Sequence, residues 1–202
     1  MRISKAALQS FEQRYRATFV NSLAGFRQAV LVGTKSKDGV GNLAIFNSLI
    51  HLGANPALFG LINRPDSVQR DTLQNIVETK SYTLNFVSSL LYEKAHQTSA
   101  RYDSAISEFD AIGFHEDYLG ECFAPAVKEA SVKIEMHFEQ AIEIAMNRTI
   151  LIIGSIQQVD FADGLLQNDG YLDLGMADIL ISQGLDAYFS PQSVARMPYA
   201  KP

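Results

Sequence analysis

The amino-acid sequence predicts a mainly β fold with flanking helices, in which about six antiparallel strands form a small closed or split barrel. Three observations predict this fold. Short apolar or alternating runs recur along the chain, tight-turn signals separate several of them, and one helical pattern lies between the third run and the fourth. A small barrel accounts for this order better than a doubly wound sheet, because the turn signals make neighbouring runs antiparallel.

The first elements are a helical segment and a β-hairpin. Residues 4–19 carry large apolar side chains at mostly helical spacings, so an amphipathic helix is expected within a leading segment of about residues 1–24. Residues 29–34 form a β-rich run. Asp38-Gly39 then supplies the positive φ angles that a tight hairpin turn requires, and a second strand is expected over residues 41–48.

A third strand and a helix occupy the middle of the chain. Residues 57–63 form an apolar run long enough for a core strand. Asp71-Thr72-Leu73-Gln74 has the form of a capping box, which predicts the start of a helix that ends near Lys80. Residues 81–87 read as the next strand, whereas residues 88–122 show no clean period.

The C-terminal part of the chain returns to strands. Residues 132–138 alternate apolar and polar side chains, and residues 149–161 are β-rich, so the two runs are expected to pair antiparallel. Asn168-Asp169-Gly170 predicts a turn, and residues 185–202 an extended tail. The 202 residues are expected to form a single domain with this tail and the leading helical segment as appendages.

Composition excludes several classes of function. The net charge is −5 and the 17 basic residues are scattered, so nucleic acid is not an expected partner. The N-terminus lacks the apolar core of a signal peptide, and the longest apolar run is too short to span a bilayer. With one cysteine, Cys122, the protein is expected in the reducing cytoplasm and away from membranes.

The sequence gives no support for a dinucleotide-binding fold, a metal site or a nucleophilic catalytic residue. Gly39-Val40-Gly41-Asn42-Leu43-Ala44 matches a dinucleotide fingerprint, but its context is a hairpin turn followed by a strand, so a Rossmann domain is rejected. The four histidines share no metal-ligand spacing, and no metal site is expected. No nucleophile elbow occurs either, and no catalytic side chain is predicted.

The connection between the third strand and the helix is a candidate phosphate site. A helix N-terminus offers free backbone N–H groups and a positive dipole end, and Arg64 or Arg70 would add charge-assisted hydrogen bonds. The hydroxyls of Ser67 and Thr72 would add further donors. The alternative is a solvated loop before a well-capped helix.

Polar side chains interrupt otherwise apolar strands at Asn42, Asn47, Ser48 and Asn85. A buried polar group needs a hydrogen-bond partner, and the edge of a bound heterocycle is one such partner. The alternative for each residue is a side chain that points to solvent or satisfies neighbouring backbone.

Together these segments resemble the flavin reductase-like, FMN-binding split-barrel family, over roughly residues 20–202. The resemblance rests on Ala29-Val30-Leu31-Val32-Gly33-Thr34, Gly41-Asn42-Leu43-Ala44-Ile45-Phe46-Asn47-Ser48, Arg70-Asp71-Thr72-Leu73-Gln74-Asn75-Ile76 and Tyr82-Thr83-Leu84-Asn85-Phe86-Val87. It continues downstream through Ser107-Glu108-Phe109, Gly113-Phe114, Ala124-Pro125, Glu129-Ala130-Ser131-Val132, Ile153-Gly154-Ser155-Ile156, Asp169-Gly170 and Gly184-Leu185-Asp186-Ala187-Tyr188.

The resemblance implies a six-stranded antiparallel split barrel, a homodimer, and one FMN per subunit near the subunit interface. It places residues along the isoalloxazine ring, largely through backbone groups: Asn42, Leu43, Ala44, Ile45, Phe46, Asn47 and Ser48. It places Arg64, Arg70 and Thr72 near the ribityl phosphate and Asn85 next to the flavin. A polar segment that carries His96, Thr98, Ser99 and Tyr102 is expected to close over the phosphate or ring.

The function that this resemblance implies is an oxidoreductase of the flavin reductase type, which takes hydride from NADH or NADPH onto FMN. Flavin and nicotinamide are then its small-molecule partners. Two alternatives stay open: an FMN-binding electron carrier without nicotinamide turnover, and a haem or pyridoxine-phosphate protein on the same barrel. Asn47 stands where many family members have Ser or Thr, and Gln69-Arg70 stands where a Lys often precedes the Asp-Thr pair. These departures concern the identity of the substrate more than the binding of the flavin.

Overall fold

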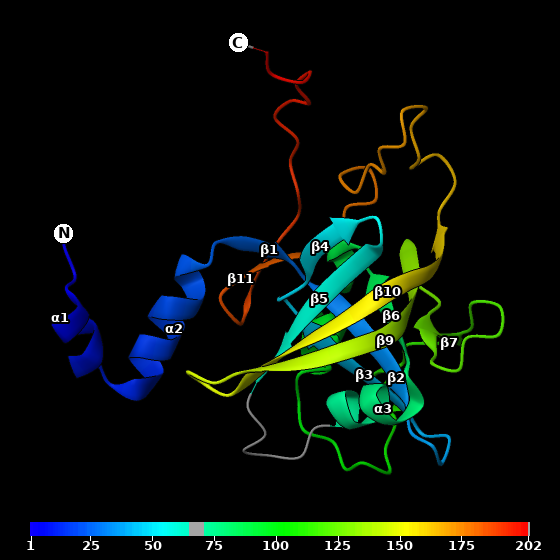
Figure 1. The fold of residues 1–202 in the computed structure, drawn as a ribbon, viewed down its shortest axis with the longest axis horizontal. Coiled ribbons are helices and arrows are strands. Elements are labelled where there is room, and N and C mark those ends of the chain that lie inside the picture. Colours follow the sequence, from blue (N-terminus) through cyan, green and yellow to red (C-terminus); the bar gives the residue numbers. More distant parts are fainter. Residues whose placement is uncertain (65–70, 202) are drawn as a thin grey trace.

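The computed structural model describes residues 1–64 and 71–201 and shows an antiparallel sheet curved into a split barrel (Figure 1). The sheet has seven strands in the order β3-β2-β6-β9-β10-β5-β4, so β3 and β4 lie at its two edges and the sheet does not close. Its strands are β2 (Val30–Lys35), β3 (Gly41–Phe46), β4 (Ile50–Ala54), β5 (Ala57–Asn63), β6 (Ser81–Phe86), β9 (Val132–Ile144) and β10 (Thr149–Phe161).

The six predicted strands are all present, and β4 is the seventh. Most side chains of β4 are exposed, so this strand shows no apolar alternation, and its pairing with β5 is what makes it a strand. The predicted turns are also confirmed. Gly39 and Gly170 both have positive φ angles, of 90° and 87°.

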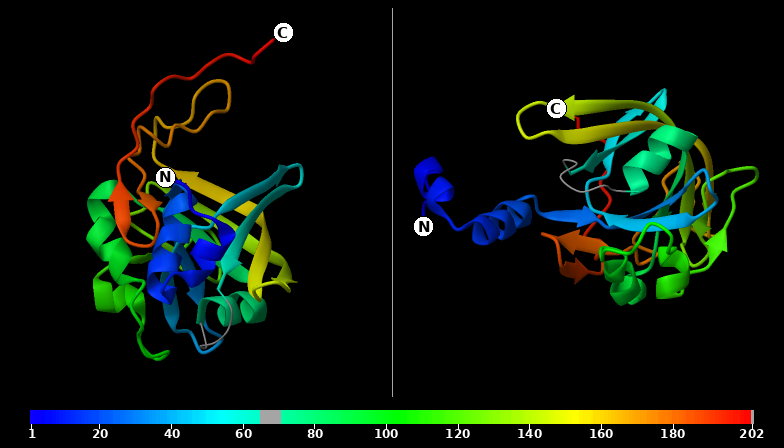
Figure 2. Two further views of the ribbon diagram at one scale, coloured as in Figure 1. Left: turned by 90° about the vertical axis from the view of Figure 1, so that its left-hand side faces the viewer. Right: turned by 90° about the horizontal axis from the view of Figure 1, so that it is seen from below.

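The leading segment consists of two helices where the sequence predicts one. Ser4 caps α1 (Lys5–Ser10), and the Glu12 carboxylate caps α2 (Gln13–Leu23) by accepting from the backbone N–H groups of Arg14 and Tyr15. Neither helix buries a residue, and both extend away from the barrel (Figure 1, Figure 2). Within the described ranges no helix combines the length and apolar character needed to cross a bilayer.

The main core lies inside the barrel and under α3 (Asp71–Thr79). Ile76 of this helix and Tyr82, Leu84 and Met136 of the strands are almost fully buried there. The helix ends where the sequence predicts, because Lys80 adopts a positive φ of 63° and turns the chain into β6. The burial of these apolar side chains supplies the main favourable term in folding.

Short elements lie outside the seven-stranded sheet. A second, three-stranded sheet pairs β1 (Phe26–Gln28) with β11 (Ile181–Gln183) and β11 with β12 (Ala187–Phe189). The segment without a clean sequence period holds the 3-10 helix η1 (Ser89–Leu91), α4 (Tyr92–Gln97), α5 (Glu108–Ile112) and the strand pair β7 (Glu116–Asp117) and β8 (Ala126–Val127). Each is too short to give a readable period.

Candidate functional site

A cavity of about 900 Å³ opens beside the edge strand β3. Its walls come from β3 and the β3–β4 connection, the end of β5, the start of α3, the segment 96–102, and the small sheet of β1, β11 and β12. Small-molecule sites commonly have volumes of about 300–1,000 Å³. The cavity is therefore large enough for a ligand of cofactor size.

The structure brings twelve of the sixteen predicted binding residues to this cavity. They come from three separate stretches of the chain. They are Asn42, Ala44, Ile45, Phe46, Asn47, Ser48, Arg64, Thr72, His96, Thr98, Ser99 and Tyr102. Ser67 and Arg70 lie outside the described residues.

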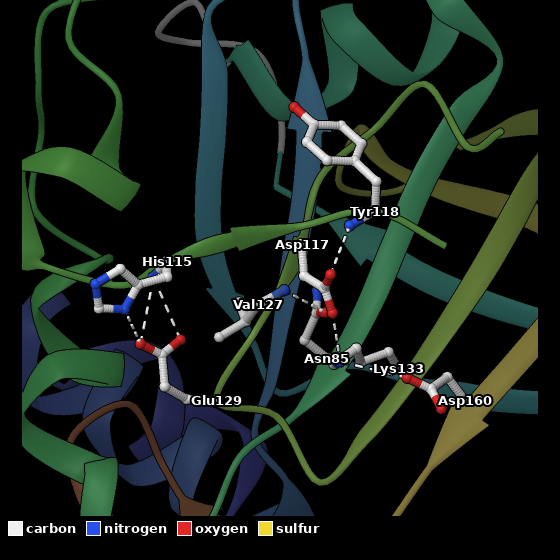
Figure 3. Close-up of polar contacts among 8 residues, drawn as sticks. All are labelled: Asn85, His115, Asp117, Tyr118, Val127, Glu129, Lys133 and Asp160. Carbon is white, nitrogen blue, oxygen red and sulfur yellow. Dashed lines mark hydrogen bonds and ion pairs between the residues drawn. The ribbon is translucent and has the colours of Figure 1, made fainter. Parts of the chain in front are cut away.

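The two remaining predicted residues, Leu43 and Asn85, lie elsewhere. Leu43 is fully buried in a second apolar cluster under α5. The Asn85 amide donates to the carbonyl oxygen of Leu31 at 3.0 Å and to Thr83 Oγ1 at 2.9 Å, and it accepts from the backbone N–H of Val127 at 2.8 Å. Figure 3 shows Asn85 beside Val127. Because these bonds hold β2, β6 and β8 together, Asn85 joins strands and does not line the cavity.

The edge of β3 presents backbone donors toward the cavity. The backbone N–H of Leu43 donates to Glu108 Oε2 at 3.0 Å, which shows that this residue's amide points away from β2. Ile45 lies two residues further along the strand, so its N–H points to the same edge. Ile45 lines the cavity, and its amide is placed to donate to a ligand there.

A buried network fixes the start of β3 against α3. Asn42 Nδ2 donates to Thr34 Oγ1 and to Thr72 Oγ1, at 3.1 Å in both cases, and Asn75 Nδ2 donates to the same Thr34 oxygen at 3.2 Å. Thr72 accepts in this network, so its hydroxyl proton remains able to donate. The network holds that hydroxyl at the cavity wall.

Asn47 and Ser48 use their side chains on the protein itself. Asn47 Nδ2 donates to the carbonyl oxygen of Gly184 at 2.7 Å and so ties the β3–β4 connection to the β11–β12 turn. Ser48 Oγ donates to the carbonyl oxygen of Ile62 and accepts from its N–H, at 3.0 and 3.1 Å. These two side chains position the cavity wall.

Residues of the segment 96–102 also line the cavity. His96 Nδ1 lies 2.8 Å from the hydroxyl of Tyr188, a residue of β12. Gln97 Nε2 donates to the Tyr102 hydroxyl at 3.1 Å, and the buried Thr98 hydroxyl donates to the carbonyl oxygen of Ala95 at 2.8 Å. The segment therefore folds back on itself and contacts the small sheet.

Thirteen described residues that line the cavity are not predicted from the sequence, and three of them, Arg27, Glu108 and Ser182, carry buried polar groups. Glu108 lies within the resemblance, but the sequence assigns it no role. Burial raises the pKa of Glu108, the backbone N–H groups of Leu43 and of Glu108 itself lower it, and the nearby Asp71 carboxylate raises it further, with a net upward shift. Arg27 Nε and Nη2 and Ser182 Oγ are buried and have no hydrogen-bond partner among residues 1–64 and 71–201.

The arrangement offers hydrogen-bond donors and charged groups of both signs to a ligand. Among the described residues, Arg27, Arg64 and Arg101 line the cavity together with amide and hydroxyl groups and with the carboxyl groups of Asp71, Glu108 and Asp186. Unpaired donors on residues that line a cavity are groups that a ligand can satisfy. No group of three or more His, Cys, Asp or Glu side chains among the described residues could hold a metal ion.

Comparisons with known proteins agree with this geometry. The sequence model of the family "Flavin reductase like domain" matches residues 24–177. The crystal structure of a candidate flavin reductase with a split barrel domain from Shewanella frigidimarina NCIMB 400 superposes with a TM-score of 0.95, at 45% identity over 99% of this chain and 100% of that chain.

Two more distant proteins extend the comparison. Nitrilotriacetate monooxygenase component B from Bacillus cereus has the same fold, with a TM-score of 0.85 and 18% identity over 98% of each chain. An uncharacterized protein of Aquifex aeolicus (strain VF5) is 31% identical over 135 residues, which cover 59% of this chain and 69% of that protein.

Proposed function

The chain belongs to the family of flavin reductase like domains, and on that premise we propose that it binds FMN and works as an NAD(P)H-dependent oxidoreductase of the flavin reductase type. The observation that carries the proposal is the cavity beside β3, where twelve residues predicted from the sequence lie together. The description of the Shewanella frigidimarina relative as a candidate flavin reductase supports it.

The residues present fit the flavin. The amide of Ile45 at the open edge of β3 would donate to the polar edge of the ring system, as backbone groups do in many cofactor sites. The Thr72 hydroxyl, the Arg64 guanidinium and the N-terminal amides of α3 would hold the phosphate. The donors of Arg27 and Ser182 that have no partner in the described part of the chain support this proposal, since a ligand could satisfy them.

Bound FMN would supply the redox chemistry, by taking up a hydride from NADH or NADPH and releasing electrons to an acceptor. The protein's own part is to bind and orient. The segment 96–102 contributes one wall, while the donors at β3 favour negative charge on a ligand beside them. No proton transfer by a side chain is needed in this scheme.

Purification followed by anaerobic titration tests the proposal. Protein that binds FMN, and whose visible flavin absorbance bleaches on addition of NADH or NADPH under argon, is the expected result. Protein that binds no added FMN would overturn it. Tight FMN binding with negligible reduction by either nicotinamide in stopped-flow measurements would instead identify an electron carrier.

We also propose that the protein is a homodimer. The helical arm of α1 and α2 projects from the barrel and exposes apolar side chains, with Val20 and Leu23 at 50% and 66% exposure. The C-terminal segment 190–201 has no regular secondary structure and exposes Val194, Met197 and Tyr199. Apolar surface of this extent is typical of a contact with a second chain.

A further inference from the structure

Arg27 and Ser182 lie directly opposite each other in neighbouring strands of the small sheet. Arg27 of β1 pairs with Ser182 of β11, so the two side chains leave the same face of the sheet. Both residues line the cavity. They are 155 positions apart in the chain, and only the β1–β11 pairing brings them together.

Both side chains carry buried hydrogen-bonding groups that nothing in the described part of the chain satisfies. Ser182 is only 3% exposed, and its Oγ has no partner. Nε and Nη2 of Arg27 are also buried and unpaired. Asp186 lines the same cavity, yet no ion pair joins it to Arg27 among the described residues.

An arginine cannot escape this situation by losing its proton, because a guanidinium stays protonated in proteins. Arg27 as a whole is only partly buried, but buried donors without a partner are costly, and such groups in native proteins are normally satisfied by another group or a ligand. Nε and one Nη lie on the same edge of the guanidinium plane. These two parallel N–H groups match the two oxygens of a carboxylate or phosphate in a bidentate pair. The Ser182 hydroxyl adds a third donor.

The position of this pair separates it from the Thr72 hydroxyl. Val30, three residues after Arg27, pairs with Phe46 at the end of β3, and Asn47 bonds to Gly184 next to β11. Asn42, which holds Thr72, lies at the start of the same strand. Four residues of a strand span about 13 Å. The Arg27–Ser182 pair and Thr72 therefore mark two different ends of the cavity.

We propose that Arg27 and Ser182 form an oxyanion subsite for the second ligand of the cavity, and that this ligand carries a carboxylate or a phosphate. The inference rests on the proposed function, in which FMN takes the other end with its phosphate toward Thr72. The second ligand is then the molecule that exchanges electrons with the flavin. Its anionic group comes either from a nicotinamide dinucleotide or from a carboxylic acid acceptor, and the test distinguishes these sources.

The test uses Arg27→Gln, which keeps polarity and removes the charged fork, beside Arg27→Lys, which keeps the charge and loses the bidentate geometry. Ser182→Ala removes the third donor. Lys37→Gln is the charge-matched control, since Lys37 lies on the exposed β2–β3 turn and is not part of the cavity lining. Circular dichroism checks that each variant folds. If Arg27→Gln does not fold, the binding measurements are made on Arg27→Lys.

Binding is measured on oxidised, FMN-loaded protein by perturbation of the flavin spectrum with NAD⁺, NADP⁺ or benzoate as the probe. We expect Arg27→Gln to weaken binding of one probe class about tenfold or more, with a smaller loss for Ser182→Ala. Loss for the dinucleotides identifies phosphate as the anion, and loss for benzoate identifies a carboxylate. Unchanged affinity for all three probes would overturn the proposal.

A second measurement compares FMN with riboflavin. The subsite proposal expects Arg27→Gln to keep the preference of the protein for FMN. Loss of that preference would assign Arg27 to the flavin phosphate and overturn the subsite. If the wild-type protein bound no FMN, the proposed function would fail by itself. Thermal shifts of the unloaded protein with inorganic phosphate and benzoate would then still decide whether Arg27 binds anions.

Discussion

The carboxylate of Glu108 accepts a 3.0 Å hydrogen bond from the backbone N–H of Leu43, across 65 positions of the chain. The bond joins the first turn of α5 to the open edge of β3, where it satisfies an amide that no strand pairs. Glu108 is 8% exposed and lies at the cavity wall. One carboxylate thus fixes the strand edge that the flavin is proposed to contact.

Glu108 should make the stability of the protein depend on pH. Its pKa is raised above the ordinary value of 4.5, chiefly by burial, so the folded state binds the proton more tightly than the unfolded chain does. The resulting stability is fully present below 4.5 and is lost as the pH rises through the folded pKa. Urea unfolding of Glu108→Gln should show a weaker decline over that window, and an unchanged decline would contradict this assignment.

Glu108→Ala is the matched comparison. Glutamine keeps an oxygen that can accept from Leu43, whereas alanine leaves the buried amide unpaired. We expect the alanine variant to lose about 1–3 kcal/mol of unfolding free energy relative to the glutamine variant. Equal stability of the two variants would mean that water replaces the carboxylate at this edge.

Asn85 should matter for stability and not for flavin binding. Replacement by alanine leaves the carbonyl oxygen of Leu31 and the N–H of Val127 without their buried partner. The expected loss of unfolding free energy is roughly 2–4 kcal/mol. FMN affinity, measured by flavin fluorescence at a temperature where the variant stays folded, should be unchanged. A large loss of affinity in the folded variant would return Asn85 to the cofactor site.

The contrast between Asn42 and Asn85 shows where sequence reasoning reaches its limit. Both are asparagines on apolar strands, and their local patterns are equivalent. The fold decides between them, because Asn42 lies on an edge strand beside α3 and Asn85 lies on an inner strand that faces β8. Local propensity and alternation predict β2, β3, α3 and β6, since those signals act within a few residues.

The features that the sequence does not predict depend on pairing between residues that are far apart in the chain. Arg27 and Ser182 meet through β1 and β11, each only three residues long, and such short strands carry no readable period. Glu108 lies in the segment without a clean pattern, and its role depends on Leu43, far away in the chain. The strand β4 similarly depends on β5 and not on its own alternation.

Thr72 should contribute to affinity for FMN but not for riboflavin. Its hydroxyl accepts from Asn42 and can donate to a phosphate, whereas valine has the same shape and no hydroxyl. Asn42 keeps its bond to Thr34 in Thr72→Val, so the network survives in part. A lost hydrogen bond to a charged group costs about 1.5–3 kcal/mol, or roughly tenfold or more in FMN affinity. Thr72→Ser should retain affinity, and an equal loss for riboflavin would exclude a phosphate contact.

Position 154 of β10 needs glycine because the side chain of Tyr82 occupies the space that a Cβ would fill. A Cβ at Gly154 would overlap the Tyr82 hydroxyl and would lie 2.8 Å from the carbonyl oxygen of His137. Gly154→Ala should therefore cost about 1–3 kcal/mol in unfolding free energy. Tyr82→Phe in the same chain should restore part of this loss, because it removes the hydroxyl but leaves the ring carbon and the carbonyl. If the losses of unfolding free energy in the two single variants simply added in the double variant, the Tyr82 hydroxyl would not be the cause of the clash.

The arm of α1 and α2 gives the sharpest test of the dimer. Val20 and Leu23 are exposed on α2, so they can make an intermolecular contact, and neither supports the barrel of its own chain. Light scattering at micromolar concentration should give twice the chain mass for the wild-type protein. Two glutamates, in Val20→Glu/Leu23→Glu, should shift the mass toward the monomer, because an interface cannot bury unpaired carboxylates cheaply.

Gln13→Glu is the control for this change, since it adds a carboxylate to the same helix at its N-terminus, where negative charge is favourable. It should leave the mass unchanged. The barrel does not depend on the arm for burial, so the double variant should keep the circular dichroism of the strands and most of its thermal stability. A wild-type protein that is monomeric at micromolar concentration would contradict the dimer, and a double variant that stays dimeric would place the interface away from α2.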